Sequence, residues 1–247
     1  MDMKSNYAIE TGYEPISSSQ MYEIENNGES IYSMKKILMM ENAGSRIADF
    51  LTAELDENIL DNPIVAVCGK GNNGGDALVA MRHLSGYILA RNKSDKKINL
   101  SVILLCSPEE LKTTESILNW QIISKIESIG KFTLKSNSIT EIEDEIKKSS
   151  IILDGIFGTG IKGEIKEPYS KVIETINCKK GTTFILAVDI PSGLDPDSGK
   201  INDKAISADA TITFHRPKHG LLKNPDVVGR LIVKKIGIPF EAERGMV

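Results

Sequence analysis

The sequence predicts an α/β fold, a Rossmann-like three-layer α/β/α sandwich with a mostly parallel central sheet. Short apolar runs alternate with amphipathic stretches, which is the pattern of β-α-β crossovers. In addition, the first apolar run leads directly into a glycine-rich turn. The runs interpreted as strands are residues 64–68, 100–106, 151–153, 183–188, 210–214 and 231–236. No clear helix separates the last two runs, so the final strands are expected to be antiparallel or edge-like.

Helical periodicity appears before and between these runs. The predicted helices are residues 17–26, 33–55, 76–89, 109–129 and 169–176. The first two precede the sheet, and the others are expected to pack on both of its faces. Residues 1–16 are interpreted as an N-terminal tail, and residues 17–247 as a single domain, a size that α/β folds commonly reach.

Composition excludes several classes of function. The chain of 247 residues has 30 basic and 34 acidic side chains, a formal charge of −4, so no global positive field favours nucleic acid or anionic lipid. Its three cysteines show no paired spacing and fit reduced thiols. No apolar run approaches a membrane span of about 20 residues, and the first residues lack the apolar core of a secretory signal. A cytoplasmic protein is therefore expected.

The strongest local signal is AVCGKGNNGGDA at residues 66–77. Its glycines satisfy the G-x-G-x-x-G pattern, and they would let backbone amides approach a pyrophosphate at the start of a helix near Asp76. However, the acidic ribose ligand of an ordinary dinucleotide site is missing, because the second strand ends in Cys106 and Ser107. Asn72, Asn73 and Asp76 add side-chain oxygens to the turn. The alternative is that Asp76 is only a helix N-cap.

Two further loops follow strands with an oxygen-bearing residue. One reads DGIFGTGIKGE from Asp154 to Glu164, and the other begins VDIPSG, with Asp189 and Ser192. Because carboxyl ends of parallel strands lie at one edge of a sheet, Asn73, Asp154, Asp189 and Ser192 are expected to converge there. Such oxygens suit a hard cation, although a plain turn-forming role for Asp154 remains open.

A basic cluster follows the run at 210–214. It consists of His215, Arg216, Lys218 and His219, grouped around a proline. Two interpretations stay open at this point: the cluster contacts ligand phosphates, or it forms a solvated turn.

Taken together, these segments resemble the YjeF N-terminal domain family, the NAD(P)H-hydrate epimerases. The motifs that carry the resemblance are LMMENAG, GKGNNGGDA, DGIFGTGIKGE, VDIPSGLD and TFHRPKHGL, and it extends over residues 17–239. The resemblance implies an isomerase for metabolite repair, which interconverts the R and S epimers of hydrated NADH and NADPH (NADHX and NADPHX). This sequence departs from the family pattern at two positions of the glycine-rich turn. It has Lys70 where proline is common and Ala77 where glycine is frequent.

The resemblance also implies site residues. Those implied to bind the hydrated dinucleotide are Asn72, Asn73, Gly74, Gly75, Asp76, Gly158, Thr159, Gly160, Ile161, Lys162, Gly163, Glu164 and Asp189. A potassium ion, one per subunit, is implied at Asn73, Asp154 and Ser192. Family members are typically homodimers, and the two leading helices would then cover the sheet or a partner subunit. Many relatives are fused to an ADP- or ATP-dependent dehydratase, so the chain is either a stand-alone enzyme or the N-terminal part of a bifunctional one.

For the reaction, Asp189 is the candidate general acid and base. The hydrated ring carries a hydroxyl at C6 beside the ring nitrogen, and its inversion requires a group that exchanges protons with that hydroxyl. Ring opening and hydroxyl loss both remain open. Two rival functions are a non-catalytic nucleotide-binding or scaffold member of the family and an ordinary NAD-dependent dehydrogenase. The missing ribose acid argues against the dehydrogenase.

Overall fold

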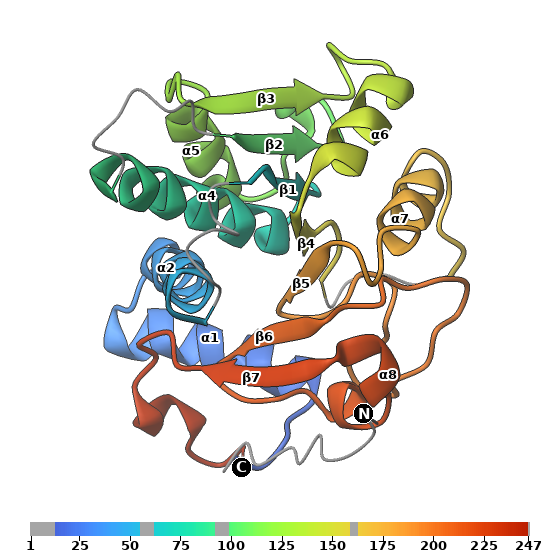
Figure 1. Cartoon of the computed structure of the whole chain (residues 1–247). Helices are drawn as coiled ribbons and strands as arrows, with labels where there is room; N and C mark the ends of the chain where they lie inside the picture. Colours follow the sequence, from blue (N-terminus) through green and yellow to red (C-terminus); the bar gives the residue numbers. More distant parts are fainter. Residues whose placement is uncertain (1–12, 55–61, 92–98, 159–162, 247) are drawn as a thin grey trace.

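The fold is a parallel sheet covered by helices on both faces. A computed structural model describes residues 13–54, 62–91, 99–158 and 163–246. Within these residues the sheet has seven strands in the order β3-β2-β1-β4-β5-β6-β7, and every neighbouring pair is parallel (Figure 1). The strands are β1 (Ile64–Cys68), β2 (Leu100–Leu104), β3 (Ile129–Thr133), β4 (Ile151–Gly155), β5 (Phe184–Val188), β6 (Ala210–Phe214) and β7 (Arg230–Lys234). The predicted Rossmann-like class is confirmed.

Central strands are buried along their whole length. Every residue of β1, β2, β4 and β6 is buried, as expected where helices cover both faces of a parallel sheet. Alternate residues of one strand therefore belong to different cores. Val65 lies in the core beneath α6 (Ile139–Lys148) and α7 (Tyr169–Asn177), and Ala66 lies in the core on the opposite face.

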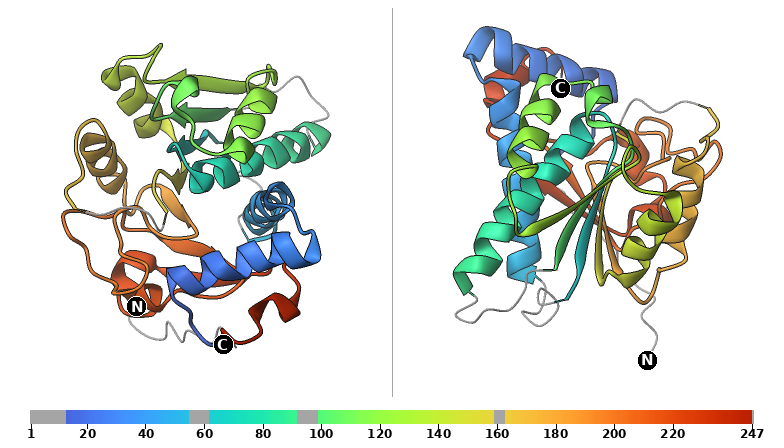
Figure 2. Two further views of the ribbon diagram at one scale, coloured as in Figure 1. Left: turned by 180° about the vertical axis from the view of Figure 1, so that it is seen from behind. Right: turned by 90° about the horizontal axis from the view of Figure 1, so that it is seen from above.

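Four helices cover the face of the sheet opposite α6 and α7. They are α1 (Ser18–Tyr32), α2 (Lys36–Glu54), α4 (Asn72–Arg91) and α5 (Thr114–Ile123). Figure 2 shows the two helical layers on either side of the sheet. No helix among the described residues is both long and apolar enough to cross a bilayer.

Helix α1 is fixed at its start, which matters for the site. Ser17 and Gln20 form a capping box. Just before it, Ile16 is buried and pairs like a strand with Lys218, and its backbone N–H donates to Pro217 at 2.9 Å. These contacts hold α1 beside the loop that follows β6.

Three expectations were wrong in detail. The last strands are parallel and not antiparallel, because η2 (His219–Leu222) and α8 (Pro225–Val228) return the chain between β6 and β7, although β7 does lie at the edge of the sheet, as the other alternative expected. The stretch 109–129 is not one helix, since a 3₁₀ turn η1 (Pro108–Glu110) precedes α5 and strand β3 begins at its end. Strand β3 and helix α6 were not predicted. The short η3 (Phe240–Glu243) follows β7.

Candidate functional site

The candidate site lies at the carboxyl edge of four neighbouring strands. Strands β1, β4, β5 and β6 are adjacent, and each ends in one of the loops singled out in the sequence. The strand order reverses at β1, whose neighbours β2 and β4 lead in opposite directions. Open α/β sheets bind ligands outside the carboxyl ends of strands at such a switch point.

The glycine-rich turn connects β1 directly to α4. A Cβ on Gly69 would lie 1.8 Å from the carbonyl oxygen of Ile156, so only glycine lets these two loops pack. Helix α4 begins at Asn72, four residues earlier than expected. Its first backbone N–H groups have no acceptor within the helix and form an anion-binding terminus. Asp76 therefore lies inside the helix, and the N-cap alternative is wrong.

Asn73 connects this turn to the two following loops. Its Nδ2 donates to the carbonyl of Val188 at 2.7 Å and to that of Phe157 at 3.3 Å. A Cβ on Gly158 would lie 2.3 Å from Asn73 Oδ1, so glycine leaves the room that this amide occupies. One side chain thus joins the loops after β1, β4 and β5.

Asp154 is fully buried near the end of β4. Its Oδ2 accepts from the backbone N–H of Ser192 at 2.8 Å, and its Oδ1 accepts from the Ser192 hydroxyl. Burial raises the pKa of Asp154 to about 6, and the hydrogen bonds from Ser192 oppose that rise. The Ser192 Oγ also accepts from the backbone N–H of Phe157 at 2.9 Å.

An oxygen-donor set therefore exists at this edge. Hydrogen bonds through Phe157 bring the amide of Asn73, the carboxylate of Asp154 and the hydroxyl of Ser192 together. A single carboxylate among neutral oxygens fits a hard cation of low charge better than zinc, which favours His and Cys ligands. Consistently, the described residues contain no cluster of three or more His, Cys, Asp or Glu that could hold a metal.

Asp189 follows β5 with a left-handed backbone, at φ 61°. Three groups donate to its Oδ1: the Thr213 hydroxyl at 2.9 Å, the Phe214 backbone N–H at 3.2 Å and the Lys218 ammonium at 2.6 Å. Its Oδ2 accepts no hydrogen bond from the described residues. Asp189 is thus anchored by one oxygen and keeps the other for a ligand.

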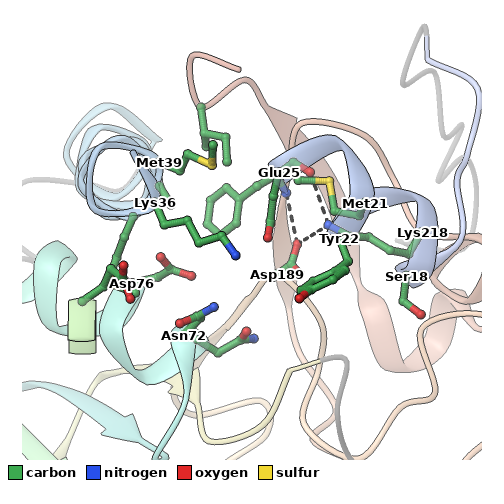
Figure 3. Close-up of a pocket in the computed structure, with 16 residues that line it drawn as sticks. Ser18, Met21, Tyr22, Glu25, Lys36, Met39, Asn72, Asp76, Asp189 and Lys218 are labelled. Carbon is green, nitrogen blue, oxygen red and sulfur yellow. Dashed lines mark hydrogen bonds and ion pairs between the residues drawn. The ribbon is translucent and has the colours of Figure 1, made fainter. Parts of the chain in front are cut away.

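Lys218 was singled out only as a member of the basic cluster, and its pairing with Asp189 was not predicted. Only 1% of it is exposed, and its Nζ also donates to the Thr213 hydroxyl at 3.1 Å and the Phe214 carbonyl at 3.3 Å. A buried lysine needs such partners, because an unpaired ammonium away from water is costly. In Figure 3, a dashed line joins Lys218 to Asp189 at the wall of a cavity.

The cavity has a volume of about 170 Å³. Since sites for drug-sized ligands usually measure about 300–1,000 Å³, it fits one ring-sized end of a larger ligand. The residues that line it are Ser18, Met21, Tyr22, Glu25, Lys36, Met39, Met40, Ala43, Asn72, Asn73, Asp76, Glu115, Asp189, Phe214, Lys218 and Ile236. Helix α1 supplies four of them, so the leading helix closes one side of the cavity (Figure 3).

Two carboxyl groups of this cavity have altered acidity. Burial raises the pKa of Asp76 well above its usual range, and the nearby charges of Asp189 and Glu25 add to the rise. Burial also raises the pKa of Glu25, while Lys218 opposes the shift. Perturbed carboxyl groups in a cavity are typical of functional sites.

Three of the four residues of the basic cluster are buried, so it is not a solvated turn, and its contact with ligand phosphates stays a prediction. His215 and Arg216 are buried, and Arg216 forms an ion pair with the buried Glu243 of η3. His215 Nε2 lies 2.7 Å from Glu243 Oε1, outside hydrogen-bond geometry. Burial lowers the pKa of His215 to about 4, helped by the charge of Lys235. Arg216 and His215 thus pack against Glu243 of η3, whereas Lys218 lines the cavity.

The second predicted binding loop is only partly described. Thr159, Gly160, Ile161 and Lys162 lie outside the described residues. Gly163 and Glu164 are exposed and are not among the residues that line the cavity. Their role in binding stays a prediction.

Some cavity residues carried no clear signal in the sequence. Tyr22, Glu25 and Lys36 lie on the two leading helices, which were expected to cover the sheet or a partner. They reach the carboxyl edge of the sheet only in the folded structure, so no local sequence pattern predicts that they lie there. Lys70, the departure in the glycine turn, forms an ion pair with Glu110 at 2.5 Å.

The reversed strand order and the ring-sized cavity at its switch point define a doubly wound α/β protein with a nucleotide-type site. Residues 36–220 match the family described as YjeF-related protein N-terminus, and the chain belongs to this family.

Similar proteins cover nearly the whole chain. The NAD(P)H-hydrate epimerase of Cenarchaeum symbiosum (strain A) is 44% identical over 232 residues, which are 94% of this chain and 99% of that protein. The NAD(P)H-hydrate epimerase of Nitrosopumilus maritimus (strain SCM1) is 42% identical over 231 residues, with the same coverage. The bifunctional NAD(P)H-hydrate repair enzyme Nnr of Archaeoglobus fulgidus is 37% identical over 92% of this chain, but over only 42% of its own length.

A solved structure supports the fold independently. The crystal structure of the yeast protein ynu0, YNL200c superposes with a TM-score of 0.65 over 85% of this chain and 84% of that chain. At 23% sequence identity, this likeness concerns the fold.

Proposed function

We propose that this protein is an NAD(P)H-hydrate epimerase, an isomerase that interconverts the R and S epimers of NADHX and NADPHX. One observation carries the proposal: Asp189 and the first residues of α4 line the same ring-sized cavity at the switch point of the sheet. Epimerases of this name that are 42% and 44% identical over almost their full length support the same activity.

The N-terminus of α4 is the proposed site for the pyrophosphate. Residues Asn72 to Asp76 are its first five residues. The backbone N–H groups of Asn72 to Gly74 and the helix dipole favour an anion, whereas the N–H of Gly75 already donates to Gly71. The glycine loop from Gly158 to Glu164 follows the neighbouring strand β4 and completes this part of the proposed site. The hydrated ring would then enter the cavity beside Asp189.

Asp189 is the proposed catalytic residue. Its Oδ1 is occupied by Lys218, Thr213 and Phe214, so the carboxylate is held in one orientation and Oδ2 can exchange a proton with the C6 hydroxyl. Lys218 compensates the charge of this carboxylate away from bulk water.

Potassium is the proposed cofactor, one ion per subunit, held by Asn73, Asp154 and Ser192. The oxygen chemistry of the three side chains supports this assignment, as do the hydrogen bonds that bring them together. The ion would supply positive charge beside the α4 terminus and join the three loops there.

Epimer analysis tests the activity. Purified protein is mixed with one resolved NADHX epimer, and the epimer ratio is followed by chromatography; NADPHX in a parallel assay gives the preference. Wild-type protein is expected to equilibrate the epimers, and Asp189→Asn to lose at least about 100-fold in rate with its fold intact. Wild-type protein that binds NADHX without changing the ratio would instead support a non-catalytic binding member of the family. Hydride transfer to a substrate would indicate a dehydrogenase.

A homodimer is part of the proposal. Apolar side chains are exposed on α1, α2 and α5, including Ile31, Leu38, Ile117 and Leu118, and exposed apolar surface of this kind favours association. Light scattering should give twice the mass of the chain for wild-type protein. The Leu118→Glu variant should shift toward monomer, whereas Leu89→Glu on α4, also an exposed leucine, should not.

A cytoplasmic location is also part of the proposal. All three cysteines are free in the structure, which fits a reducing cytoplasm. The bifunctional relatives are more than twice as long as the segment they share with this chain. We therefore expect a dehydratase of the S epimer, separate or fused, to consume the product.

A further inference from the structure

Asp76 is a buried carboxyl group whose role the binding assignment does not explain. Only 8% of it is exposed, yet its side chain makes no hydrogen bond or ion pair with any described residue. Its oxygens are not among the fully buried side-chain atoms that lack a partner in the described residues, so they face the cavity, where a bound ligand can reach them.

Its surroundings favour the uncharged acid. Met39, Met40 and Ala43 of α2 form an apolar wall of the same cavity. The charged groups that line this cavity with Asp76 are Glu25 from α1, Lys36 from α2, Glu115 from α5, Asp189 after β5 and Lys218 before η2. Burial and the negative charges of Asp189 and Glu25 raise the pKa of Asp76, and Lys218 only partly opposes them.

Asp189 has the opposite environment in the same cavity. It forms an ion pair with Lys218 at 2.6 Å, whereas Asp76 forms no ion pair with a described residue. Figure 3 shows Asp76 and Asp189 on different sides of the cavity, with Lys36 and Asn72 between them. Two carboxyl groups in such different environments are a common way to provide an acid and a base at one pH.

We propose that Asp76 is the second proton-transfer residue of this site, a general acid that acts on the ring from the side opposite Asp189. The inference rests on the proposed epimerase function and adds a residue to its chemistry. A single carboxylate reaches one face of a ring, whereas inversion at C6 by hydroxyl loss needs proton transfer on both.

The step balances as follows for hydroxyl loss. Asp76 gives its proton to the C6 hydroxyl, the C–O bond breaks with its electron pair on oxygen, and water leaves as the N1 lone pair forms a C6=N1 double bond. Water then adds to the other face, the double-bond pair returns to N1, and Asp189 takes the proton. An epimer of the opposite hand, or proton exchange with solvent, restores the starting state.

Glu25 is the competing candidate, and its neighbours argue against it. Lys218 and Lys36 both oppose the rise in the pKa of Glu25, and Asp189 is the one negative charge that adds to it. By contrast, two negative charges, Asp189 and Glu25, add to the rise in the pKa of Asp76. Asp76 also lies on α4 beside the proposed pyrophosphate site, where bound substrate would place its nicotinamide end close by.

The Asp76→Asn variant tests the proposal, because it keeps the size of the side chain and removes the acidic proton. Its kcat for NADHX inversion is expected to fall about 10²- to 10⁴-fold, with KM little changed and thermal unfolding as in wild type. In wild-type protein kcat should decrease at high pH as Asp76 loses its proton, and this limb should be absent from the residual activity of the variant. Asp76→Ser serves the same purpose if the first variant does not fold. Asp49→Asn, the same change at an exposed position of α2, is the matched control and should keep wild-type activity.

Two further readouts separate the possible failures. Infrared spectra of wild-type protein should contain a protonated-carboxyl band near neutral pH that Asp76→Asn lacks, whether or not the epimerase assay succeeds. Inversion in ¹⁸O-labelled water should place the label at C6. An active wild type together with a fully active Asp76→Asn variant overturns the role of Asp76, and so does absence of the label. An inactive wild type that still shows the carboxyl band contradicts the proposed epimerase function instead.

Discussion

The ammonium of Lys218 lies 2.6 Å from Oδ1 of Asp189, at a position where 1% of the lysine is exposed. Asp189 lies directly after β5 and Lys218 lies in the loop after β6. These two strands are neighbours in the sheet. The pair therefore contributes to stability and also fixes the orientation of the proposed catalytic carboxylate.

Replacing Lys218 by Met should destabilise the fold and abolish inversion. Removing one partner of a buried ion pair leaves the other charge uncompensated, at a cost of about 3–5 kcal/mol in the free energy of unfolding. Urea unfolding measures this loss. The double variant Lys218→Met/Asp189→Asn should recover part of the stability and none of the activity. If both variants unfold with the same free energy, the pair does not act as described.

Two glycines of the turn after β1 should tolerate alanine very differently. A Cβ on Gly69 would lie 1.8 Å from a backbone oxygen of Ile156, whereas a Cβ on Gly71 meets nothing within 4 Å. Gly69→Ala must separate the loops after β1 and β4, so we expect a loss of about 2 kcal/mol or more, as for overpacked sites. Gly71→Ala is the matched control and should change stability little. Thermal unfolding of the two variants compares them, and equal melting temperatures would contradict the close approach at Gly69.

The sequence predicted the edge of the sheet well because its signals there are local. Apolar runs that end in Gly, Asn or Asp determine both the strand and the loop, and Asn73, Asp154 and Ser192 are indeed connected by hydrogen bonds. Potassium at these residues, and the binding role of the second glycine loop, stay predictions.

Other features depend on tertiary contacts that no local pattern reports. Strand β3 contains Gly130 and Lys131 and is only partly buried, so its apolar run is interrupted. The parallel pairing of β6 and β7 depends on a connection whose α-helix has four residues. Lys218 looks like a surface residue in the sequence, and only the strand-like pairing with Ile16 and the ion pair with Asp189 bury it.

Stability should decrease as the pH falls from 7 toward 4, partly because of His215. Its pKa is about 4 in the folded protein, against 6.5 for an unperturbed histidine. Between these values the unfolded chain binds a proton that the folded protein does not, so its contribution is complete above about pH 6.5 and is lost toward pH 4. At 1.36 kcal/mol per pKa unit, the largest contribution is about 3 kcal/mol.

The His215→Asn variant isolates this contribution. Asparagine tolerates the left-handed backbone at φ 66°, so the substitution removes the titrating ring without imposing strain. Urea unfolding of both proteins at several pH values between 4 and 7 should give a shallower pH dependence for the variant. Carboxyl groups away from His215 titrate in both proteins and cancel in the comparison, whereas the pKa of Glu243, which His215 helps to lower, changes with the substitution. Parallel curves would show that His215 is protonated in the folded state.

Potassium should stabilise the protein through Asp154. An ion that binds only the folded chain adds about 2.7 kcal/mol when its concentration is 100 times the dissociation constant. The melting temperature of wild-type protein should therefore be higher in potassium chloride than in choline chloride of the same ionic strength. Asp154→Asn should remove this difference, because the only carboxylate of the proposed donor set is lost. Glu164→Gln, at an exposed residue of the neighbouring loop, should retain the difference. An equal potassium effect in wild type and Asp154→Asn would place the ion elsewhere, since a buried carboxylate that held it could not be replaced by an amide without weakening the binding.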